Sequence, residues 1–284
     1  MLTSFKFVTL SSVNFALTLA DFVVKQMKKI VIAGAGRMGS WLVESLCLDY
    51  EVGVYDSDPS KLKYLFNSHR LLSYKEIEEF NPDMLINAVS LQYTIKVFKE
   101  LLPYLSDQCI LADITSVKTP LREFYLNSGR RFVSTHPMFG PTFANIKELS
   151  NQSAIIIKQS DEEGKKFFRN FYSSFGIKIF EYSFIDHDKT IAYSLSIPFA
   201  STMVFAACMK QQEAPGTTFK KHLEIAKGLL SEDDYLLSEI LFSPYTSDQI
   251  ESISKQMARL IGIIKEKNTT DMKRFLGELR NNIS

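Results

Sequence analysis

Apolar residues form short unbroken runs up to about residue 182 and recur at helical spacing beyond it. The short runs lack the alternation of half-exposed strands, so they predict strands that are buried on both faces of a parallel sheet. These strands are expected near residues 28–33, 51–55, 71–72, 83–89, 109–114, 132–135, 154–157 and 178–181. Helical segments lie between them, at about 38–48, 58–66, 93–104, 161–175 and after residue 118. The alternation of strand and helix indicates an α/β fold with a doubly wound sheet covered on both faces.

The second part of the chain has a helical pattern throughout. Helices are expected near residues 187–210, 219–230, 233–242, 247–267 and 271–281. Residues 187–210 are apolar nearly all round, which is typical of a helix buried in a core or between subunits, and Pro198 predicts a kink in it. We therefore divide the folded chain into residues 27–182, which carry the sheet, and residues 183–284, an all-α domain.

The first 26 residues are expected to lie outside the fold. The run from Phe5 to Val24 is moderately apolar but is interrupted by Ser, Thr and Asn. It is too polar for a membrane span and makes a poor signal peptide. We interpret residues 1–26 as an N-terminal extension and Met27, directly before the first strand, as a natural start.

The first strand ends in the motif Gly34-Ala35-Gly36-Arg37-Met38-Gly39, which leads into a helix. In this context Gly34 permits a tight turn, Gly36 lets the backbone approach a pyrophosphate, and Gly39 allows close packing of helix on strand. The pyrophosphate would lie on free N–H groups at the helix N-terminus. An ordinary glycine turn in another α/β protein is the alternative.

The second strand ends at Asp56, about 20 residues after the glycines. A carboxylate there accepts hydrogen bonds from an adenosine ribose diol and repels a 2′-phosphate, which predicts NAD rather than NADP as the cofactor. An arginine such as Arg37 could instead pair with that phosphate. The expected cofactor-binding residues are Gly34, Ala35, Gly36, Arg37, Met38, Gly39, Asp56, Val89 and Ser90.

Charge and cysteine content limit the partners, metals and cell compartment that we expect for the protein. The 33 Lys and Arg residues balance 32 Asp and Glu residues, and a net charge of +1 gives no reason to expect nucleic acid or a membrane as a partner. Cys47, Cys109 and Cys208 lack the spacing of a metal site, and their odd number argues against a disulfide framework. We therefore expect a cytoplasmic protein without a bound metal.

Two polar motifs follow the ends of later strands, where ligands bind in open α/β sheets. They are Asp113–Lys118 and Thr135–Pro141. His136 can accept a proton near neutral pH, as a dehydrogenase acting on an alcohol requires. Ser116 could orient that imidazole or a substrate hydroxyl, and Lys118 could pair with a substrate carboxylate. Taken singly, the three residues could instead be a core histidine, a helix cap and a solvated lysine.

Together these motifs resemble those of the prephenate dehydrogenase family. The matching residues are Gly34–Gly39, Asp113–Lys118, His136–Pro141 and Asp186–Asp188, and the resemblance extends from about Met27 to the C-terminus. The fold it implies is a Rossmann-like domain followed by an all-helical dimerisation domain, which builds an intertwined homodimer. The activity it implies is NAD-dependent oxidative decarboxylation of prephenate to 4-hydroxyphenylpyruvate in tyrosine biosynthesis.

The resemblance also implies a role for each polar residue. His136 would take the proton of the ring hydroxyl while a hydride passes to NAD, and Ser116 would share its hydrogen-bond network. Lys118 would lie in the substrate site. His187 matches a histidine that opens the first helix of the second domain, and it is expected to bind substrate.

The chain departs from the family pattern in its second domain. Many relatives carry an arginine there that binds a substrate carboxylate, whereas residues 220–228 contain none. Lys227 is the favoured substitute, with Lys221 and His222 as further candidates, although lysine lacks the planar fork of arginine.

This departure leaves the choice between prephenate and arogenate open. Another oxidoreductase of short-chain acids with a helical second domain is a further alternative. A catalytically silent dinucleotide-binding scaffold or sensor belongs to a different class. The presence of Ser116, Lys118 and His136 together argues against a catalytically silent protein, because a scaffold needs none of them.

Overall fold

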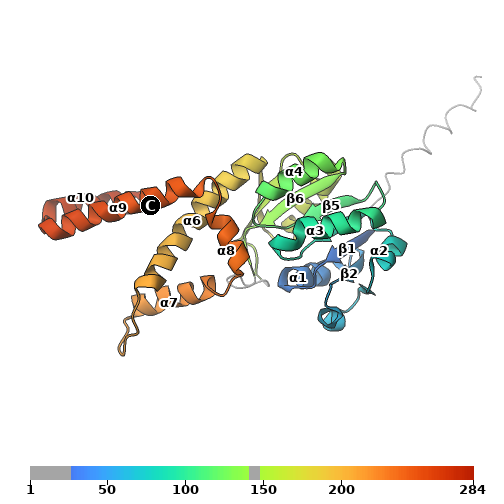
Figure 1. The fold of residues 1–284 in the computed structure, drawn as a ribbon, viewed down its shortest axis with the longest axis horizontal. Coiled ribbons are helices and arrows are strands. Elements are labelled where there is room, and N and C mark those ends of the chain that lie inside the picture. Colours follow the sequence, from blue (N-terminus) through green and yellow to red (C-terminus); the bar gives the residue numbers. More distant parts are fainter. Residues whose placement is uncertain (1–26, 141–147) are drawn as a thin grey trace, which may run out of the picture.

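The computed structural model describes residues 27–140 and 148–284. The chain forms a sheet region, residues 29–182, and a helical region, residues 184–284 (Figure 1). The helical region extends away from the sheet region, with one long helix leading outward and a helical hairpin at the far end.

Eight strands form one sheet in the order β3-β2-β1-β4-β5-β6-β7-β8. The strands are β1 (Lys29–Ala33), β2 (Glu51–Tyr55), β3 (His69–Leu71), β4 (Met84–Asn87), β5 (Ile110–Asp113), β6 (Phe132–Pro137), β7 (Ser153–Ile157) and β8 (Lys178–Tyr182). Strand β1 pairs in parallel with both β2 and β4. The strand order reverses at this point, so a ligand site is expected beyond the carboxyl ends of β1 and β4.

Helices cover both faces of the sheet. They are α1 (Arg37–Leu46), α2 (Tyr74–Phe80), α3 (Leu91–Leu101), α4 (Thr119–Ser128) and α5 (Glu162–Ser174), with 3-10 helices at Pro59–Tyr64 and Leu102–Tyr104. Successive residues of β1 point into different cores: Ile30 belongs to the core that contains Trp41 of α1, whereas Val31 belongs to the core that contains Phe98 of α3. Both β1 residues are 0% exposed. Burial on two faces explains why the strand sequences show no alternation.

The helical region is built around one long helix. It consists of α6 (Phe184–Cys208), α7 (Thr217–Leu229), α8 (Asp234–Leu241), α9 (Thr246–Glu266) and α10 (Thr269–Asn282). Helix α6 contacts α7, α8 and α9, and Ser196 of α6 shares a hydrogen bond of 2.8 Å with Thr246 of α9. Pro198 lies within α6. Among the described helices, α6 alone has the length and apolar composition to cross a membrane, and 17% of its most apolar stretch is buried.

The predicted fold class is confirmed, and the structure differs from the predicted elements in three places. Strands β6 and β7 pair antiparallel, so the sheet is mixed rather than parallel. An antiparallel pair needs no crossover helix, and alternation of elements could not reveal it. The segment Pro59–Tyr64 is a 3-10 helix rather than an α-helix, and the short helix α2 is not foreseen in the sequence pattern.

The change from sheet to helices falls where the sequence pattern changes. Strand β8 ends at Tyr182 and α6 begins at Phe184. The division into domains 27–182 and 183–284 remains a prediction. The predicted extension, residues 1–26, lies outside the described residues.

Candidate active site

The glycine motif forms a tight turn between β1 and α1. Gly34 has a φ of +103°, and a Cβ there would lie 2.8 Å from the backbone of Ala88 and Val89. A Cβ on Gly39 would lie 1.8 Å from the carbonyl oxygen of Gly34. Gly36 faces open space instead, since a Cβ there would meet no atom within 4 Å. Two glycines thus close the turn, and the third leaves room over it for a ligand.

Asp56 lines a cleft of about 350 Å³ beside this turn, which we call the Asp56 cleft. One carboxylate oxygen accepts a hydrogen bond from the N–H of Ala35 at 2.8 Å. The other accepts one from the N–H of Asp58 at 2.9 Å and lies 3.3 Å from Nζ of Lys61. These contacts fix the carboxylate, and because a carboxylate has about four acceptor positions, it can still accept a ribose hydroxyl.

Aromatic side chains form another wall of the Asp56 cleft. Tyr55, Tyr74 and Tyr93 line it together with Glu100 of α3. Tyr74 donates a hydrogen bond of 2.8 Å to Glu100, and burial together with this bond raises the pKa of Tyr74. Planar rings of this kind suit a nucleobase. Sequence reasoning missed this wall, because Tyr74 lies on α2 and no motif marks the four residues.

Two further cavities continue from the Asp56 cleft toward the helical region. A cavity of about 170 Å³ shares Val89 and Ser90 with the cleft. A larger cavity of about 410 Å³ shares Ser116 and Leu236 with the smaller one. The three cavities therefore follow one path from Asp56 to the contact between the sheet region and the helical region.

The 410 Å³ cavity, which we call the seam pocket, is lined by both regions. The sheet region supplies polar side chains that include Ser116, His136 and Gln152. The helical region supplies an apolar wall, made of Leu195, Phe199, Leu229, Leu236, Leu237 and Ile240. His136 is 5% exposed on β6. Within the described residues, no hydrogen bond joins Ser116 to His136, although the two line the same cavity.

His136 belongs to a chain of three side chains that crosses between the two regions. Its Nδ1 lies 3.0 Å from Nε2 of His187, and Nδ1 of His187 lies 3.0 Å from the carboxylate of Asp188. Asp188 also accepts hydrogen bonds from the hydroxyl of Thr119 at 2.8 Å and from the N–H of Lys118 at 3.4 Å. The start of α6 is thereby joined both to the start of α4 and to His136. His187 itself is 0% exposed, so it lies behind His136 rather than in the pocket.

Hydrogen bonding sets the proton positions along this chain. A carboxylate only accepts, so His187 donates to Asp188 through Nδ1, and its Nε2 accepts from Nδ1 of His136. Nε2 of His136 then keeps its lone pair. Burial, followed by the nearby His187 and Lys118, holds the pKa of His136 well below its ordinary value of 6.5. Burial also lowers the pKa of His187, against the opposing effect of Asp188. His136 is thus a neutral imidazole at neutral pH, able to accept a proton.

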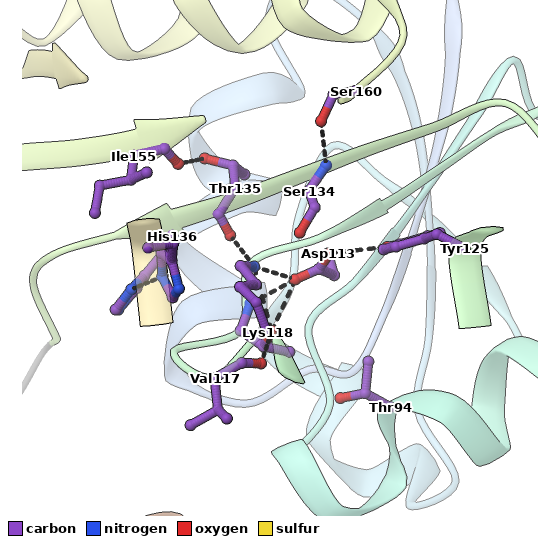
Figure 2. Close-up of polar contacts among 12 residues, drawn as sticks. Thr94, Asp113, Val117, Lys118, Tyr125, Ser134, Thr135, His136, Ile155 and Ser160 are labelled. Atoms are coloured by element: carbon purple, nitrogen blue, oxygen red, sulfur yellow. Dashed lines mark hydrogen bonds and ion pairs between the residues drawn. The ribbon is translucent and has the colours of Figure 1, made fainter. Parts of the chain in front are cut away.

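Lys118, the residue expected to pair with a substrate carboxylate, does not line the seam pocket. Its side chain is 0% exposed, and its ammonium pairs with the buried carboxylate of Asp113 (Figure 2). Lys118 also donates hydrogen bonds to the carbonyl of Thr135 at 2.7 Å and to the hydroxyl of Thr115 at 3.3 Å. Burial lowers the pKa of Lys118, and Asp113 opposes this effect. The ammonium therefore joins the ends of β5 and β6 next to His136.

The other basic residues expected to bind substrate also lie elsewhere. Lys221, His222 and Lys227 are exposed on α7, and none of them lines the seam pocket. Within the described residues, no Lys or Arg lines this pocket, and its one acidic side chain is Glu232. Sequence reasoning missed Glu232, because only the tertiary fold brings the turn after α7 to His136. No group of three or more His, Cys, Asp or Glu residues in the described chain could hold a metal ion.

Comparison with protein sequences points to one family. Residues 55–175 match the family described as "Prephenate dehydrogenase, nucleotide-binding domain". The probable arogenate/prephenate dehydrogenase of Methanocaldococcus jannaschii is 23% identical over 271 residues, which cover 87% of this chain and 59% of that protein. The T-protein of Enterobacter agglomerans is 23% identical over 224 residues, which cover 75% and 56% of the two proteins. The chain spans about half the length of the curated relatives it matches.

Solved structures show the same fold over both regions. Prephenate dehydrogenase from Aquifex aeolicus, in complex with hydroxyphenyl propionate and NAD+, superposes with a TM-score of 0.76 at 22% identity, covering 90% of this chain and 97% of that chain. Arogenate dehydrogenase from Synechocystis gives a TM-score of 0.70 at 17% identity and covers 89% and 98% of the two chains. The resemblance to the prephenate dehydrogenase family is confirmed.

Proposed function

Starting from this family resemblance, we propose that the protein is an NAD-dependent dehydrogenase that oxidises and decarboxylates prephenate or arogenate. Prephenate would give 4-hydroxyphenylpyruvate, and arogenate would give tyrosine. The observation that carries the proposal is the position of His136: a neutral, buried imidazole lines a pocket at the end of a continuous path from the Asp56 cleft. A silent scaffold would need no such base at this place.

The Asp56 cleft fits NAD. The open space over Gly36 admits a pyrophosphate, and the fixed carboxylate of Asp56 can accept a ribose hydroxyl. The residues that would hold the cofactor are those of the turn Gly34–Gly39 together with Asp56, Val89 and Ser90. Bound NAD supplies the acceptor for a hydride from the substrate ring. The 170 Å³ cavity beside Val89 and Ser90 connects the Asp56 cleft with the seam pocket, which supports hydride transfer from a substrate bound there.

His136 moves the proton of the reaction. Its Nε2 accepts the proton of the ring 4-hydroxyl as the ring carbon loses hydride and becomes a carbonyl. The bond from the ring to the carboxylate carbon then breaks, carbon dioxide leaves, and the electron pair enters the ring. The resulting phenolate recovers the proton from His136. The imidazole is therefore restored after each turnover.

His187 and Asp188 position this base and stabilise its charged form. When His136 gains a proton on Nε2, its Nδ1–H continues to donate to His187, whose Nδ1–H donates to Asp188. The Asp188 carboxylate stabilises the positive charge that develops on the two imidazoles. Both residues act through His136, because neither lines the seam pocket.

The apolar wall of the seam pocket favours loss of the carboxylate. Leu195, Phe199 and Leu237 offer the substrate no hydrogen-bond donor. A carboxylate held against such side chains is poorly stabilised, whereas neutral carbon dioxide leaves without this penalty. Ser116 is the hydroxyl group of the pocket that can hydrogen-bond the reacting end of the ring.

The direct experiment is NADH formation by the purified full-length protein with prephenate and, separately, with arogenate. We expect turnover of at least one substrate with NAD as the oxidant. Lack of NADH with both substrates, in protein shown by calorimetry to bind NAD, would refute the proposed activity.

We also propose that the protein works as a homodimer in the cytoplasm. The helical region leaves large apolar side chains exposed, among them Tyr193 and Val204 of α6, Ile261 of α9 and Leu279 of α10. Apolar surface spread over several helices is typical of an obligate interface, which resembles a core cut in half. Polar residues alternate with these side chains on α9 and α10, which suits a second copy of the chain better than a membrane.

A further inference from the structure

We propose that Glu232 makes the enzyme select a substrate whose side chain carries an ammonium group, which is arogenate rather than prephenate. The inference rests on the proposed function and assigns the substrate of the same pocket. Its basis is the charge of the seam pocket, where a carboxylate stands and no Lys or Arg of the described residues lines the wall.

Glu232 is held in the pocket wall by the turn between α7 and α8. Its backbone N–H donates a hydrogen bond of 3.2 Å to the carbonyl of Leu229, the last residue of α7. The side chain is partly buried and lines the seam pocket together with His136. Within the described residues, no Lys, Arg or His lies within 4.0 Å of its carboxylate. Among the described residues, Glu232 therefore offers a carboxylate without a cationic partner to whatever occupies the pocket.

This charge disfavours prephenate. Prephenate carries two carboxylates, one on the ring and one on its keto-acid side chain, and it has no cationic group. Taking a carboxylate out of water costs several kcal/mol unless a cation or several donors replace the water. The described wall offers the amide of Gln152 and the hydroxyl of Ser116 as neutral donors, whereas Glu232 adds repulsion.

The same charge favours arogenate. Its side chain has the same carboxylate but replaces the keto group with an ammonium. With the ring hydroxyl at His136, the side chain on the opposite ring carbon extends toward another part of the pocket. An ammonium there can donate to Glu232, which is a charge-assisted hydrogen bond, while the amide of Gln152 can donate to the neighbouring carboxylate. Glu232 thus replaces the missing arginine with a different kind of recognition.

The first test compares the two substrates at saturating NAD. We expect kcat/KM of the wild-type protein to be at least about 10-fold higher for arogenate than for prephenate. Glu232→Gln keeps the shape but removes the charge, and it should lower kcat/KM for arogenate by about 10- to 100-fold without lowering it for prephenate. Glu224→Gln removes the same charge from the exposed face of α7 and should change neither value. Wild-type preference for prephenate, or an equal loss for both substrates in Glu232→Gln, would overturn the inference.

The second test separates this inference from the proposed reaction. L-Tyrosine and 3-(4-hydroxyphenyl)propionate share a ring, a phenol and a carboxylate, and they differ in one ammonium group. Calorimetry on the NAD-loaded full-length protein should show tighter binding of tyrosine, by about 10-fold or more, and Glu232→Gln should remove the difference. Equal binding of the two probes to the wild-type protein would refute the role of Glu232. Failure of both substrates to yield NADH would refute the reaction instead, and the probe comparison would still decide the role of Glu232.

Discussion

The two regions bury their side chains to very different extents. In the sheet region, β1, β4 and β5 are almost wholly buried, and the Lys118–Asp113 pair inside it has 0% exposure. In the helical region, the 21 residues of α9 include two buried ones, Thr246 and Ile263. The buried residues of α6 end at Ser196, although its sequence is apolar beyond that point. The sheet region therefore completes its own core, whereas the helical region presents apolar surface that a second copy would cover.

The largest expected effect comes from His136, where the two regions meet. His136→Asn keeps a polar side chain but removes the proton acceptor, so turnover should fall by about 10²–10⁴-fold. NAD affinity should stay near the wild-type value, because the Asp56 cleft is untouched. Steady-state kinetics and calorimetric NAD binding on one preparation check both statements. The control His69→Asn changes an exposed histidine on β3 and should leave turnover unchanged. A stable His136→Asn protein with near-normal turnover would remove His136 from the mechanism.

The second prediction tests whether Lys118 stabilises the sheet region rather than binding the substrate. Lys118→Met leaves the Asp113 carboxylate buried without its cation, which should lower the free energy of unfolding by about 3–5 kcal/mol. Urea unfolding measures this change. The control Lys166→Met alters an exposed lysine on α5 and should have an effect within about 0.5 kcal/mol. A Lys118→Met protein of normal stability but raised KM would instead restore the substrate role.

The third prediction tests whether the exposed apolar side chains of the helical region form an interface, as those of the sheet region do not. Val204 on α6 is 53% exposed, and Leu48 after α1 is 83% exposed. Val204→Lys places a charge in the proposed interface and should shift the protein from dimer to monomer, whereas Leu48→Lys should leave the dimer intact. Light scattering at micromolar concentration distinguishes these states. A wild-type monomer, or equal behaviour of the two variants, would show that the helical region does not pair.

The smallest effect is the pH dependence of stability that the buried histidines produce. Burial holds the folded-state pKa of both His136 and His187 below the value of 6.5 that histidine has in the unfolded chain. Below pH 6.5 the unfolded chain therefore binds protons that the folded protein excludes, and the free energy of unfolding falls as the pH drops. Each histidine contributes at most about 1.4 kcal/mol per pH unit.

Urea unfolding between pH 7 and pH 5 measures this slope. His187→Asn removes one of the two buried histidines and should reduce the slope. An unchanged slope in the His187 variant would show that its imidazole titrates equally in both states.

The parts of the site that short motifs encode could be predicted from the sequence. Gly34 and Asp56 follow strand ends and His136 lies in the last part of β6, and the parallel pairing of β2, β1, β4, β5 and β6 is enough to bring these positions to one edge. The strands themselves could be predicted because most buried strands form short apolar runs without alternation. The helix α2 could not, since its seven residues carry too little periodicity. The antiparallel pairing of β7 also leaves no mark on the sequence of the strand.

The site residues whose placement differs from the expected one have a common physical cause. Lys118 follows the end of β5, but the sequence does not show that its ammonium folds back onto Asp113. His187 was expected in the substrate site, whereas its ring lies behind His136. Glu232 was missed because its place depends on how the helical region packs against the sheet region. Each case depends on side-chain direction or on packing between distant segments, which spacing along the chain does not determine.

The chain of His136, His187 and Asp188 is complete only after α6 has packed against the sheet region. Asp188 and His187 arrive with α6, while His136 belongs to β6. A sheet region that had folded before α6 docked would hold the dinucleotide, yet its base would lack the partners that set its tautomer. In the proposed reaction, hydride transfer would then wait until α6 had docked. A partly folded molecule would thus bind the cofactor without reducing it.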